Sequence, residues 1–499
     1  MITFVLNGIK RDFEGDTEES LLDHLRFENR ITSAKDGCSG EGTCGACTVL
    51  INGKARLACR TKMKELDGAE VCTIEGLPDG FRAVISRNFA LYGAVQCGFC
   101  SPGMIMRAMG LYNQTKTPSR SEIIKAITPN LCRCTGYVKI IDAIEASFLE
   151  MNGSPAGREL PRALTGNPYP KYMASETALG KRDFVDDMHF EGMAYGALRF
   201  SDHPRARVRE IDITAALKIT GVIKIFTAAD IPGEHKTGLI FSDWPLMIGE
   251  GMMTHYAGDV LAGVVAESEA AARKAASLIR IEYDPLRAVT DIHEAIKPET
   301  DCVHEGRSNV LETCTIRSGD VEKALMEARW VSSGTYETQR IEHAFLETEA
   351  AIALPEADGI RLYSQGQGVY IDRKAVASIL ALPEDKVRVI QVQNGGGFGG
   401  KEDITVQGHA ALFAYMLKRP VKVHLSREES IVMHPKRHPV WMEISLACDE
   451  NGKFTALKLN AIGDTGAYAS VGTKVMERVV GHATGAYSVP VTEIRAVTV

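Results

Sequence analysis

Eight of the twelve cysteines in this 499-residue chain fall into two tight groups. The first group is spaced C-x5-C-x2-C-x11-C and the second C-x2-C-x31-C-x1-C. Each group supplies four thiols, the number that a [2Fe–2S] cluster requires. Two such sets indicate an electron relay, and a relay implies redox chemistry elsewhere in the chain. The eight cysteines are Cys38, Cys44, Cys47, Cys59, Cys97, Cys100, Cys132 and Cys134.

Composition excludes several classes of protein. The net charge is -7, so the chain lacks the excess of basic residues that is typical of nucleic-acid-binding proteins. The sequence contains no run of about 18 apolar residues that could span a membrane, and its N-terminus does not resemble a signal peptide. Clustered thiols in so long a chain favour metal binding over disulfides. We therefore expect a cytoplasmic protein that binds neither nucleic acid nor membrane.

The first cysteine group is expected on a ferredoxin-like fold. Residues 2–7 alternate like a strand, and Asn7-Gly8 and Asn52-Gly53 are hairpin signals. Between the two hairpins, the glycine-rich loop 36–49 carries three of the four cysteines, and Cys59 is expected on the returning strand. Glycines let such a loop point backbone N–H groups at a small cluster. Zinc also suits four thiolates, but the strand–loop–strand setting favours the cluster.

The second cysteine group is expected between helices. Residues 80–93, 103–114 and 138–150 show helical periodicity, and Ser119 with Glu122 forms a capping box before another helix. Two interhelical loops could therefore close on one cluster. Zinc is again the alternative occupant.

The motifs around the second group carry a family resemblance. Gln96–Gly103 reads QCGFCSPG and Leu131–Tyr137 reads LCRCTGY. Both closely resemble the helical iron–sulfur domain of the molybdenum hydroxylases, the family of xanthine dehydrogenase and aldehyde oxidoreductase. The resemblance implies two [2Fe–2S] clusters and a molybdenum–molybdopterin cofactor in its dinucleotide form. It also implies that Gln96 hydrogen-bonds the pterin.

The resemblance implies an α+β multidomain fold. A polar stretch rich in proline and glycine indicates a linker after the iron–sulfur part. Because no FAD-sized domain separates the iron–sulfur part from the rest, FAD is expected on a partner subunit. The expected order is a β-grasp ferredoxin-like domain (1–76), a helical-bundle [2Fe–2S] domain (77–152), the linker (153–174), an α/β hammerhead domain (175–287) and the N-terminal part of a molybdopterin-binding domain (310–499).

A second glycine-rich segment, NGGGFGGKED at 394–403, follows an expected strand and precedes an expected helix. Such a turn can cradle an anionic group with backbone N–H groups. It formally matches the GxGxxG pattern of a Rossmann fold, but the acidic residue expected about 20 residues later has no clean candidate. A purely structural turn is a further alternative. The segment resembles the dithiolene-binding segment of the molybdenum hydroxylases nearly letter for letter.

The resemblance assigns cofactor roles around this turn. Gly397, Phe398 and Gly399 are implied to bind the cofactor, with the backbone of the last two facing the molybdenum ligands. Gln367 matches the glutamine that hydrogen-bonds a molybdenum ligand, and Gln365 is a nearby competitor for this role.

Two further residues are candidates for substrate binding. Glu402 matches the acidic residue with which xanthine-oxidising members hold the purine, although a carboxylate at a helix N-terminus is an alternative reading. Arg478, in VMERVV, matches a substrate-binding arginine more loosely, and a surface arginine is its alternative. His434 and His438 resemble a metal pair, but the intervening Pro435 argues against a helix, so we interpret them as structural.

We therefore expect a molybdenum-dependent hydroxylase of purine-type heterocycles, such as xanthine or hypoxanthine, that passes electrons through two [2Fe–2S] clusters to an external acceptor. Gln367, Glu402 and Arg478 are its candidate catalytic residues. An aldehyde oxidoreductase of the same family and a non-catalytic iron–sulfur electron carrier are the alternatives. We expect the chain to be an incomplete portion, inactive alone, that needs the remainder of the molybdopterin domain, and to form homo-oligomers.

Overall fold

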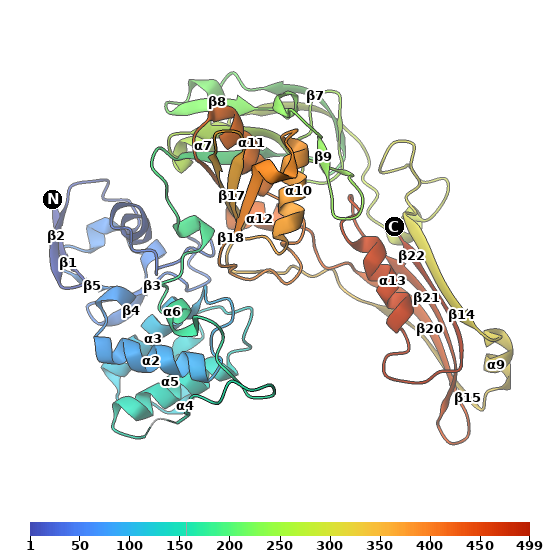
Figure 1. Cartoon of the computed structure of the whole chain (residues 1–499), viewed down its shortest axis with the longest axis horizontal. Helices are drawn as coiled ribbons and strands as arrows, with labels where there is room; N and C mark the ends of the chain where they lie inside the picture. The colour runs from blue at the N-terminus through green and yellow to red at the C-terminus, as the bar shows by residue number, and fades with distance from the viewer. Residues whose placement is uncertain (156) are drawn as a thin grey trace.

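The computed structural model describes residues 1–155 and 157–499. In Figure 1 the blue and cyan region on one side holds the first two expected domains. A layered region with green strands and orange helices lies in the centre, and an elongated yellow and red sheet extends to the other side. The N-terminus lies at the edge of the first region and the C-terminus beside the elongated sheet.

Five strands form the sheet of the N-terminal domain: β1 (Ile2–Leu6), β2 (Ile9–Phe13), β3 (Thr48–Ile51), β4 (Lys54–Leu57) and β5 (Glu70–Cys72). Their order is β2-β1-β5-β3-β4, with β1 and β5 parallel and the other neighbours antiparallel. Both expected hairpins are present, since Asn7 and Gly8 have φ of 51° and 81° and Asn52 and Gly53 have φ of 50° and 73°, as a type I′ turn requires. The short helix α1 (Leu21–Asp23) packs against this sheet. The β-grasp arrangement is therefore confirmed.

Four helices form the second domain: α2 (Asp79–Leu91), α3 (Ser101–Gln114), α4 (Arg120–Ile127) and α5 (Val138–Met151). The expected capping box opens α4, where Ser119 Oγ accepts a 3.4 Å hydrogen bond from the Glu122 amide and the Glu122 carboxylate accepts one of 2.7 Å from the Ser119 amide. Tyr112 of α3 stacks on Phe148 of α5 with ring centroids 5.2 Å apart. One cysteine pair of the second group precedes α3 and the other precedes α5.

Seven strands form the central sheet: β6 (Ala194–Phe200), β8 (Val222–Phe226), β12 (Val260–Ala266), β16 (Ala350–Pro355), β17 (Ile360–Ser364), β18 (Val387–Gln391) and β19 (Val421–His424). Their order is β18-β17-β16-β19-β6-β12-β8. β19 pairs in parallel with β6, so Val421 lies opposite Ala194. Strands of the expected hammerhead domain therefore share one sheet with strands of the expected molybdopterin-binding domain. β12 is buried along its whole length, which explains its uniformly apolar sequence.

Helices and two small sheets pack around the central sheet. The helices are α7 (Glu269–Ser277), α10 (Val369–Ile379), α11 (Gln407–Leu417) and α12 (Arg427–Met433). Phe413 of α11 stacks on Phe226 of β8 with ring centroids 4.7 Å apart, in the largest buried core. The small sheets comprise β7 (Ala206–Asp212), β11 (Met253–Thr254) and β13 (Arg280–Pro285), and β9 (Lys236–Thr237) with β10 (Trp244–Pro245).

Five strands form the elongated sheet: β14 (Glu312–Ser318), β15 (Trp330–Glu337), β20 (Val440–Cys448), β21 (Phe454–Gly463) and β22 (Val491–Thr498). Their order is β14-β22-β21-β20-β15. Helix α13 (Gly472–His482) packs on this sheet (Figure 1). Three shorter helices are α6 (Ala174–Ala178), α8 (Ile292–Ala295) and α9 (Val321–Glu327).

Buried ion pairs hold the N-terminal domain against the chain that follows the linker. Arg26 pairs with Asp186 at 2.6 Å and with Asp187 at 3.0 Å, and Lys35 also pairs with Asp187. Lys35 and Asp187 side chains are each 1% exposed. Burial raises the pKa of Asp186, but the surrounding cations outweigh it and hold the pKa well below its usual range. Such pairs are costly to break singly, so they fix the first domain in place.

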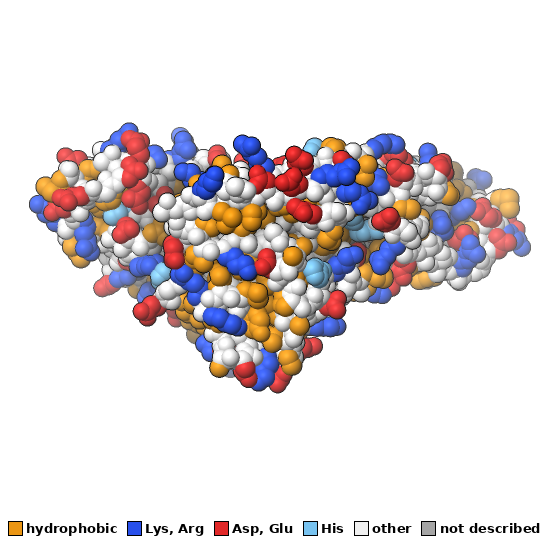
Figure 2. Space-filling view, turned by 90° about the horizontal axis from the view of Figure 1, so that it is seen from above, with side chains coloured by type: hydrophobic (Ala, Val, Ile, Leu, Met, Phe, Trp, Pro, Cys, Tyr) orange, Lys and Arg blue, Asp and Glu red, His pale blue; other side chains and the backbone are white. Residues whose placement is uncertain are grey.

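The surface carries charges of both signs. Figure 2 shows lysine and arginine side chains interspersed with acidic ones over the face it presents. Within the described residues, every helix is too short or too polar to cross a bilayer.

Candidate functional site

The four thiols of the first cysteine group converge inside the N-terminal glycine-rich loop. Cys38, Cys44, Cys47 and Cys59 are between 2% and 9% exposed, and all are free thiols. Hydrogen bonds among them lower the pKa of Cys38 and Cys47 and raise the pKa of Cys44 and Cys59. Cys59 lies in the 3₁₀ turn Ala58–Arg60 just after β4. The expectation of a strand was wrong here, because the amide of Ala58 bonds to the Cys47 carbonyl at 3.2 Å and turns the chain over the loop.

The helical domain packs directly on this loop. Gly45 has a φ of 72°, and a Cβ there would lie 2.7 Å from the Pro129 carbonyl oxygen. Asn130 donates from Nδ2 to the Gly45 carbonyl at 2.8 Å, and the Leu131 amide donates to the Cys44 carbonyl at 2.8 Å. Glycine is therefore required at position 45 both for its backbone conformation and for the close approach of the second domain.

The second cysteine group converges in the same way. The thiols lie close enough to shift the pKa of one another, in the pairs Cys97–Cys134, Cys100–Cys132 and Cys132–Cys134. These contacts lower the pKa of Cys97 and Cys132 and raise the pKa of Cys100 and Cys134. The Tyr137 hydroxyl accepts from the Cys132 amide at 2.9 Å and steadies this loop. Both groups thus offer four converging free thiols, the donor set that a [2Fe–2S] cluster takes.

The second glycine-rich segment forms an irregular turn between β18 and α11. Gly396, Phe398 and Gly399 have φ of 106°, 56° and 90°. The expected helix does not follow directly, since α11 begins at Gln407. The intervening residues are held as a loop by buried side chains, including a 2.5 Å hydrogen bond from Ser470 to Asp403. Within the described part of the chain, the amides of residues 396–398 donate to no protein acceptor, which leaves them available to an anionic group.

Gln367 and Gln365 have different environments at this turn. The Gln367 side chain is exposed, and its Oε1 accepts from the amides of Gly399 at 3.0 Å and Lys401 at 3.2 Å. A Cβ on Gly397 would lie 2.4 Å from the same oxygen. Gln365 is 1% exposed and donates to the Thr348 carbonyl at 2.7 Å. Gln367 is thus presented at the surface of the turn, whereas Gln365 belongs to the interior.

A buried ion pair supports the turn from below. Lys401 and Glu347 lie 3.3 Å apart and are each 2% exposed. The Glu347 carboxylate also accepts from the Gly395 amide at 2.5 Å. Burial raises the pKa of Glu347 and lowers the pKa of Lys401, and each partner opposes the effect on the other. Sequence reasoning missed this pair, although a glutamate inside the apolar run HAFLETEAAIAL was a signal for it.

The turn lies next to the second cysteine group. Gln393 donates from Nε2 to the Cys97 carbonyl at 2.6 Å, and a Cβ on Gly395 would lie 3.0 Å from Phe99 Cδ2. Gln96 itself is exposed, and its carbonyl accepts from the Lys171 ammonium. The structure therefore brings residues 393–395 against the Cys97 loop.

A cavity of about 740 Å³ opens beside the turn. Phe398, Gly399 and Glu402 line it. Glu402 does not stand at a helix N-terminus, since α11 begins five residues later. Arg478 is exposed on α13 and donates to the Lys474 carbonyl at 3.1 Å, outside the cavity lining, so its substrate role stays a prediction. Cationic side chains in the lining are Arg133, Lys436 and Arg437.

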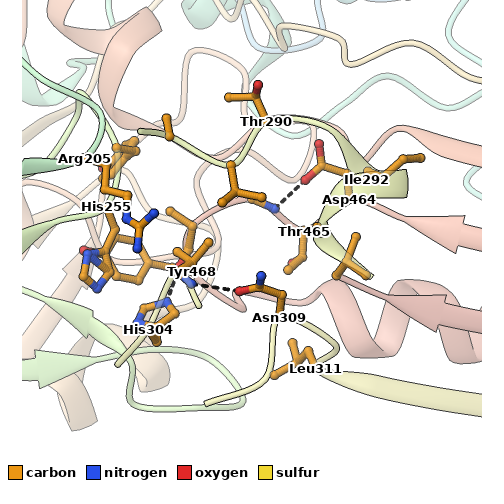
Figure 3. A pocket seen from close by; sticks show the side chains of 18 of the residues that line it. Arg205, His255, Thr290, Ile292, His304, Asn309, Leu311, Asp464, Thr465 and Tyr468 are labelled. Atoms are coloured by element: carbon orange, nitrogen blue, oxygen red, sulfur yellow. Dashed lines mark hydrogen bonds between the residues drawn. The ribbon is translucent and has the colours of Figure 1, made fainter. Parts of the chain in front are cut away.

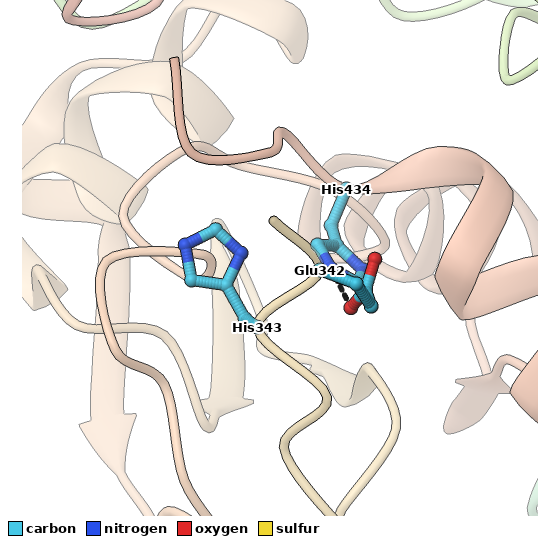
Figure 4. Close-up of side chains that lie close together, drawn as sticks. All are labelled: Glu342, His343 and His434. Atoms are coloured by element: carbon cyan, nitrogen blue, oxygen red, sulfur yellow. Dashed lines mark ion pairs between the residues drawn. The ribbon is translucent and has the colours of Figure 1, made fainter. Parts of the chain in front are cut away.

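A histidine, His434, lies between two carboxylates, and Figure 4 shows one of them, Glu342, beside it. His434 contacts Glu342 at 2.7 Å through Nε2 and Glu349 at 3.1 Å through Nδ1, and its side chain is fully buried. Burial lowers the pKa of His434, but the two carboxylates outweigh it and raise the pKa. Glu342, His343 and His434 offer atoms close enough for a metal ion. However, each ring nitrogen of His434 faces a carboxylate oxygen, and Lys436 lies 3.1 Å from Glu342. A cation thus already neighbours Glu342, which argues against a metal ion at this position.

His438 lines the same cavity as Glu402. It follows α12 in the loop HPKRHP and contacts the Thr465 hydroxyl at 3.3 Å. Neither His434 nor His438 lies on a helix.

A second, smaller pocket of about 280 Å³ has its own set of lining residues (Figure 3). His255 and His304 meet edge to face at 4.4 Å, and Tyr468 donates to Asp259 at 2.8 Å. Burial lowers the pKa of His255 to about 3, so this imidazole is neutral. The pocket shares no lining residue with the larger cavity.

Four family models match consecutive parts of the chain. A 2Fe-2S iron-sulfur cluster binding domain matches residues 11–85, and a [2Fe-2S] binding domain matches 73–145. The a/b hammerhead domain of aldehyde oxidase and xanthine dehydrogenase matches 179–287, and a molybdopterin cofactor-binding domain matches 303–499.

Several curated proteins are similar in sequence. The nicotinate dehydrogenase large molybdopterin subunit of Eubacterium barkeri is 35% identical over 63% of this chain and 74% of its own length. The aldehyde oxidoreductase of Megalodesulfovibrio gigas is 30% identical over 97% of this chain and 56% of its own. A probable xanthine dehydrogenase subunit of Bacillus subtilis is 36% identical over 62% of this chain and 42% of its own. The chain thus spans about half the length of the last two relatives.

The fold agrees with these similarities. The solved aldehyde oxidoreductase from Desulfovibrio gigas superposes with a TM-score of 0.95 at 28% identity, over 100% of this chain and 58% of that one. The two sets of converging thiols and the free amides of the glycine turn fit the groups that the matched domains bind. The chain therefore belongs to the molybdenum hydroxylase family of xanthine dehydrogenases and aldehyde oxidoreductases, with two [2Fe–2S]-binding domains, a hammerhead domain and a molybdopterin-binding domain.

Proposed function

We propose that this chain is part of a molybdenum hydroxylase that oxidises purine-type heterocycles such as xanthine or hypoxanthine. The observation that carries the proposal is the position of Glu402 in the cavity lined by Phe398 and Gly399. A carboxylate there can accept a purine N–H, or donate to a ring nitrogen when protonated. Arg437, which is exposed in the same cavity, offers the cationic partner that sequence reasoning placed at Arg478.

The proposal assigns the cofactor contacts to this chain's own residues. The residues that would hold the molybdopterin are Gly397, Phe398, Gly399, Gln367 and Gln96. When bound, the molybdopterin supplies the oxidation chemistry. Gln367 Oε1 is already committed to two backbone amides, so its Nε2 is the atom left to meet a ligand. The free amides of the turn would face the anionic part of the cofactor.

The two cysteine groups are proposed to hold the clusters and to form the outward path for electrons. The second group comes first in this path, because Gln393 joins its Cys97 loop to the turn. The first group follows, since the Leu131 amide contacts the Cys44 carbonyl. We infer that the acceptor is an FAD-binding partner subunit or another carrier. The remainder of the molybdopterin domain, homo-oligomer formation and a cytoplasmic location belong to the same proposal.

An aldehyde oxidoreductase is the second candidate function. The aldehyde oxidoreductase relative aligns with 97% of this chain, and its solved counterpart covers all of it. Glu402 distinguishes the two, since a purine offers N–H and ring-nitrogen partners that an aldehyde lacks.

Metal analysis and substrate turnover of the complete enzyme test the proposal. We expect about four iron atoms per chain, two for each four-thiolate group, together with molybdenum. Turnover of xanthine and hypoxanthine should exceed that of an aromatic aldehyde. Glu402→Gln should lower kcat/KM for purines about 10- to 100-fold, as the loss of about 1.4 to 2.7 kcal/mol of transition-state binding implies. Glu428→Gln, at an exposed acid of α12, is the control.

Other outcomes would redirect the assignment. Equal losses with purine and aldehyde, or faster aldehyde turnover, would favour the aldehyde oxidoreductase. Iron without molybdenum or pterin would favour the non-catalytic electron carrier. Stoichiometric zinc in place of iron would contradict the cluster assignment.

A further inference from the structure

Arg427 makes an unusual set of contacts for the first residue of a short helix. Its Nε and one terminal nitrogen donate to the Gly37 carbonyl at 3.0 and 2.8 Å. Its backbone amide donates to the Ser39 hydroxyl at 2.8 Å. Arg427 therefore contacts the residues on both sides of Cys38, although it lies 390 positions after Gly37 in the chain.

The same side chain also reaches the segment that supports the glycine turn. Its terminal nitrogen donates to the Leu346 carbonyl at 2.7 Å, and Leu346 precedes Glu347, which accepts from the Gly395 amide. Arg427 is thus positioned between the first cysteine loop and the support of the cofactor turn.

The guanidinium binds the backbone of the loop that carries the thiols. A Cβ on Gly37 would lie 3.4 Å from Cys44 Sγ, and Gly37 is the residue whose carbonyl Arg427 holds. The loop is buried, with Cys38 5% exposed and Cys44 3% exposed, so bulk water screens the interaction only weakly. An arginine keeps its positive charge at every accessible pH.

We propose that Arg427 is a positioning residue that raises the reduction potential of the cluster at Cys38, Cys44, Cys47 and Cys59, an inference that rests on the cluster ligands proposed above. One-electron reduction adds one negative charge to a cluster whose four thiolates already make it anionic. A fixed cation beside the loop stabilises the reduced state more than the oxidised state, because potential follows net charge and the surrounding hydrogen bonds. This biases the electron toward the first cluster, away from the turn.

Redox titration followed by electron paramagnetic resonance tests the inference on the purified holoenzyme, with dithionite as the electron donor. Arg427→Gln removes the charge and keeps some hydrogen bonding. We expect the equilibrium constant for reducing the first cluster to fall about tenfold, a shift of about 59 mV to lower potential for one electron. Arg427→Lys keeps the charge and should restore most of the wild-type potential. The second cluster should not shift in either variant.

Arg419→Gln is the matched control. Arg419 precedes β19 and pairs with Glu267 at 3.0 Å, away from the cysteine loops, so both potentials should stay at wild-type values. The signal that disappears in Cys47→Ser identifies the first cluster.

Three results would overturn the role of Arg427. The first is an unchanged reduction potential of the first cluster in Arg427→Gln, measured on protein that retains its full iron content. Both clusters could shift equally, which would indicate a global effect. The first cluster could be lost in both the Gln and Lys variants, which would leave Arg427 as a structural clamp alone. A wild-type protein without two iron–sulfur signals would instead refute the cluster assignment itself.

Discussion

Gln393 Nε2 donates a 2.6 Å hydrogen bond to the carbonyl oxygen of Cys97. Gln393 immediately precedes the glycine-rich segment 394–403, and Cys97 belongs to the second cysteine group. The bond therefore joins the proposed cofactor cradle to the proposed cluster loop across 296 positions of sequence. Gln393 is 9% exposed and Cys97 is half-buried, so the bond lies in a partly buried contact.

Replacing Gln393 by leucine should loosen the contact between these two loops. The Cys97 carbonyl would lose its donor in a partly buried setting, at a cost of about 1 kcal/mol. We expect a lower midpoint for the first calorimetric transition and faster proteolysis in the linker 153–174. Gln391→Leu is the control, because Gln391 bonds to the Gly366 carbonyl within its own domain. Equal proteolysis of both variants would contradict a docking role for Gln393.

Replacing Gly397 by alanine should displace the side chain of Gln367. The added Cβ would lie 2.4 Å from Gln367 Oε1, so the amide could no longer accept from Gly399 and Lys401. We expect molybdenum content to fall several-fold while iron content stays near wild type, as measured by elemental analysis. Gly481→Ala, where a Cβ meets nothing within 4 Å, should change neither metal. A parallel loss of iron would point to general misfolding.

The ion pair beneath the turn should be strongly cooperative. Lys401→Met would leave Glu347 buried without its cation, at a cost of about 3–5 kcal/mol. The double variant Lys401→Met with Glu347→Gln should recover part of that loss, because the uncompensated charge is then removed. Chemical denaturation of Lys401→Met, of Glu347→Gln and of the double variant gives the coupling energy between the two residues. Additive effects would mean that the two residues act independently.

Local signals predicted the elements of the fold well. The Asn-Gly hairpins and the capping box at Ser119 depend on neighbours in sequence, and both are present. The two cysteine groups could be recognised because the spacing of cysteines along the sequence indicates which of them can bind the same cluster. The helix expected after the glycine turn is present as α11, but it begins only at Gln407 because buried contacts of Asp403 and Lys401 hold the preceding segment as a loop.

Contacts between distant segments could not be read in the same way. Arg427 is an ordinary arginine in sequence, and only the fold brings it to Gly37. Gln365 and Gln367 lie two positions apart in the sequence. Gln365 is buried and bonds to Thr348 and Lys401, whereas Gln367 is exposed, and the sequence does not reveal these contacts. The sharing of one sheet by two expected domains is equally non-local, since β19 pairs with β6.

The buried His434 should make stability depend on pH. Burial lowers its pKa, but Glu342 and Glu349 outweigh this and raise the folded-state pKa above the ordinary value; His343 and Lys436 are the other titratable groups that face this cluster. A raised pKa means that the imidazolium contributes its full stability below the unfolded pKa of about 6.5 and loses it as pH rises through the folded pKa. Replacement by glutamine, which cannot be charged, should remove this contribution. The stability difference between wild type and His434→Gln, measured by urea denaturation, should therefore be large near pH 6 and shrink as pH rises. His438→Gln, in the same loop, should show the opposite trend because burial lowers the pKa of His438, and a pH-independent difference for His434→Gln would show that its imidazole is neutral in the fold.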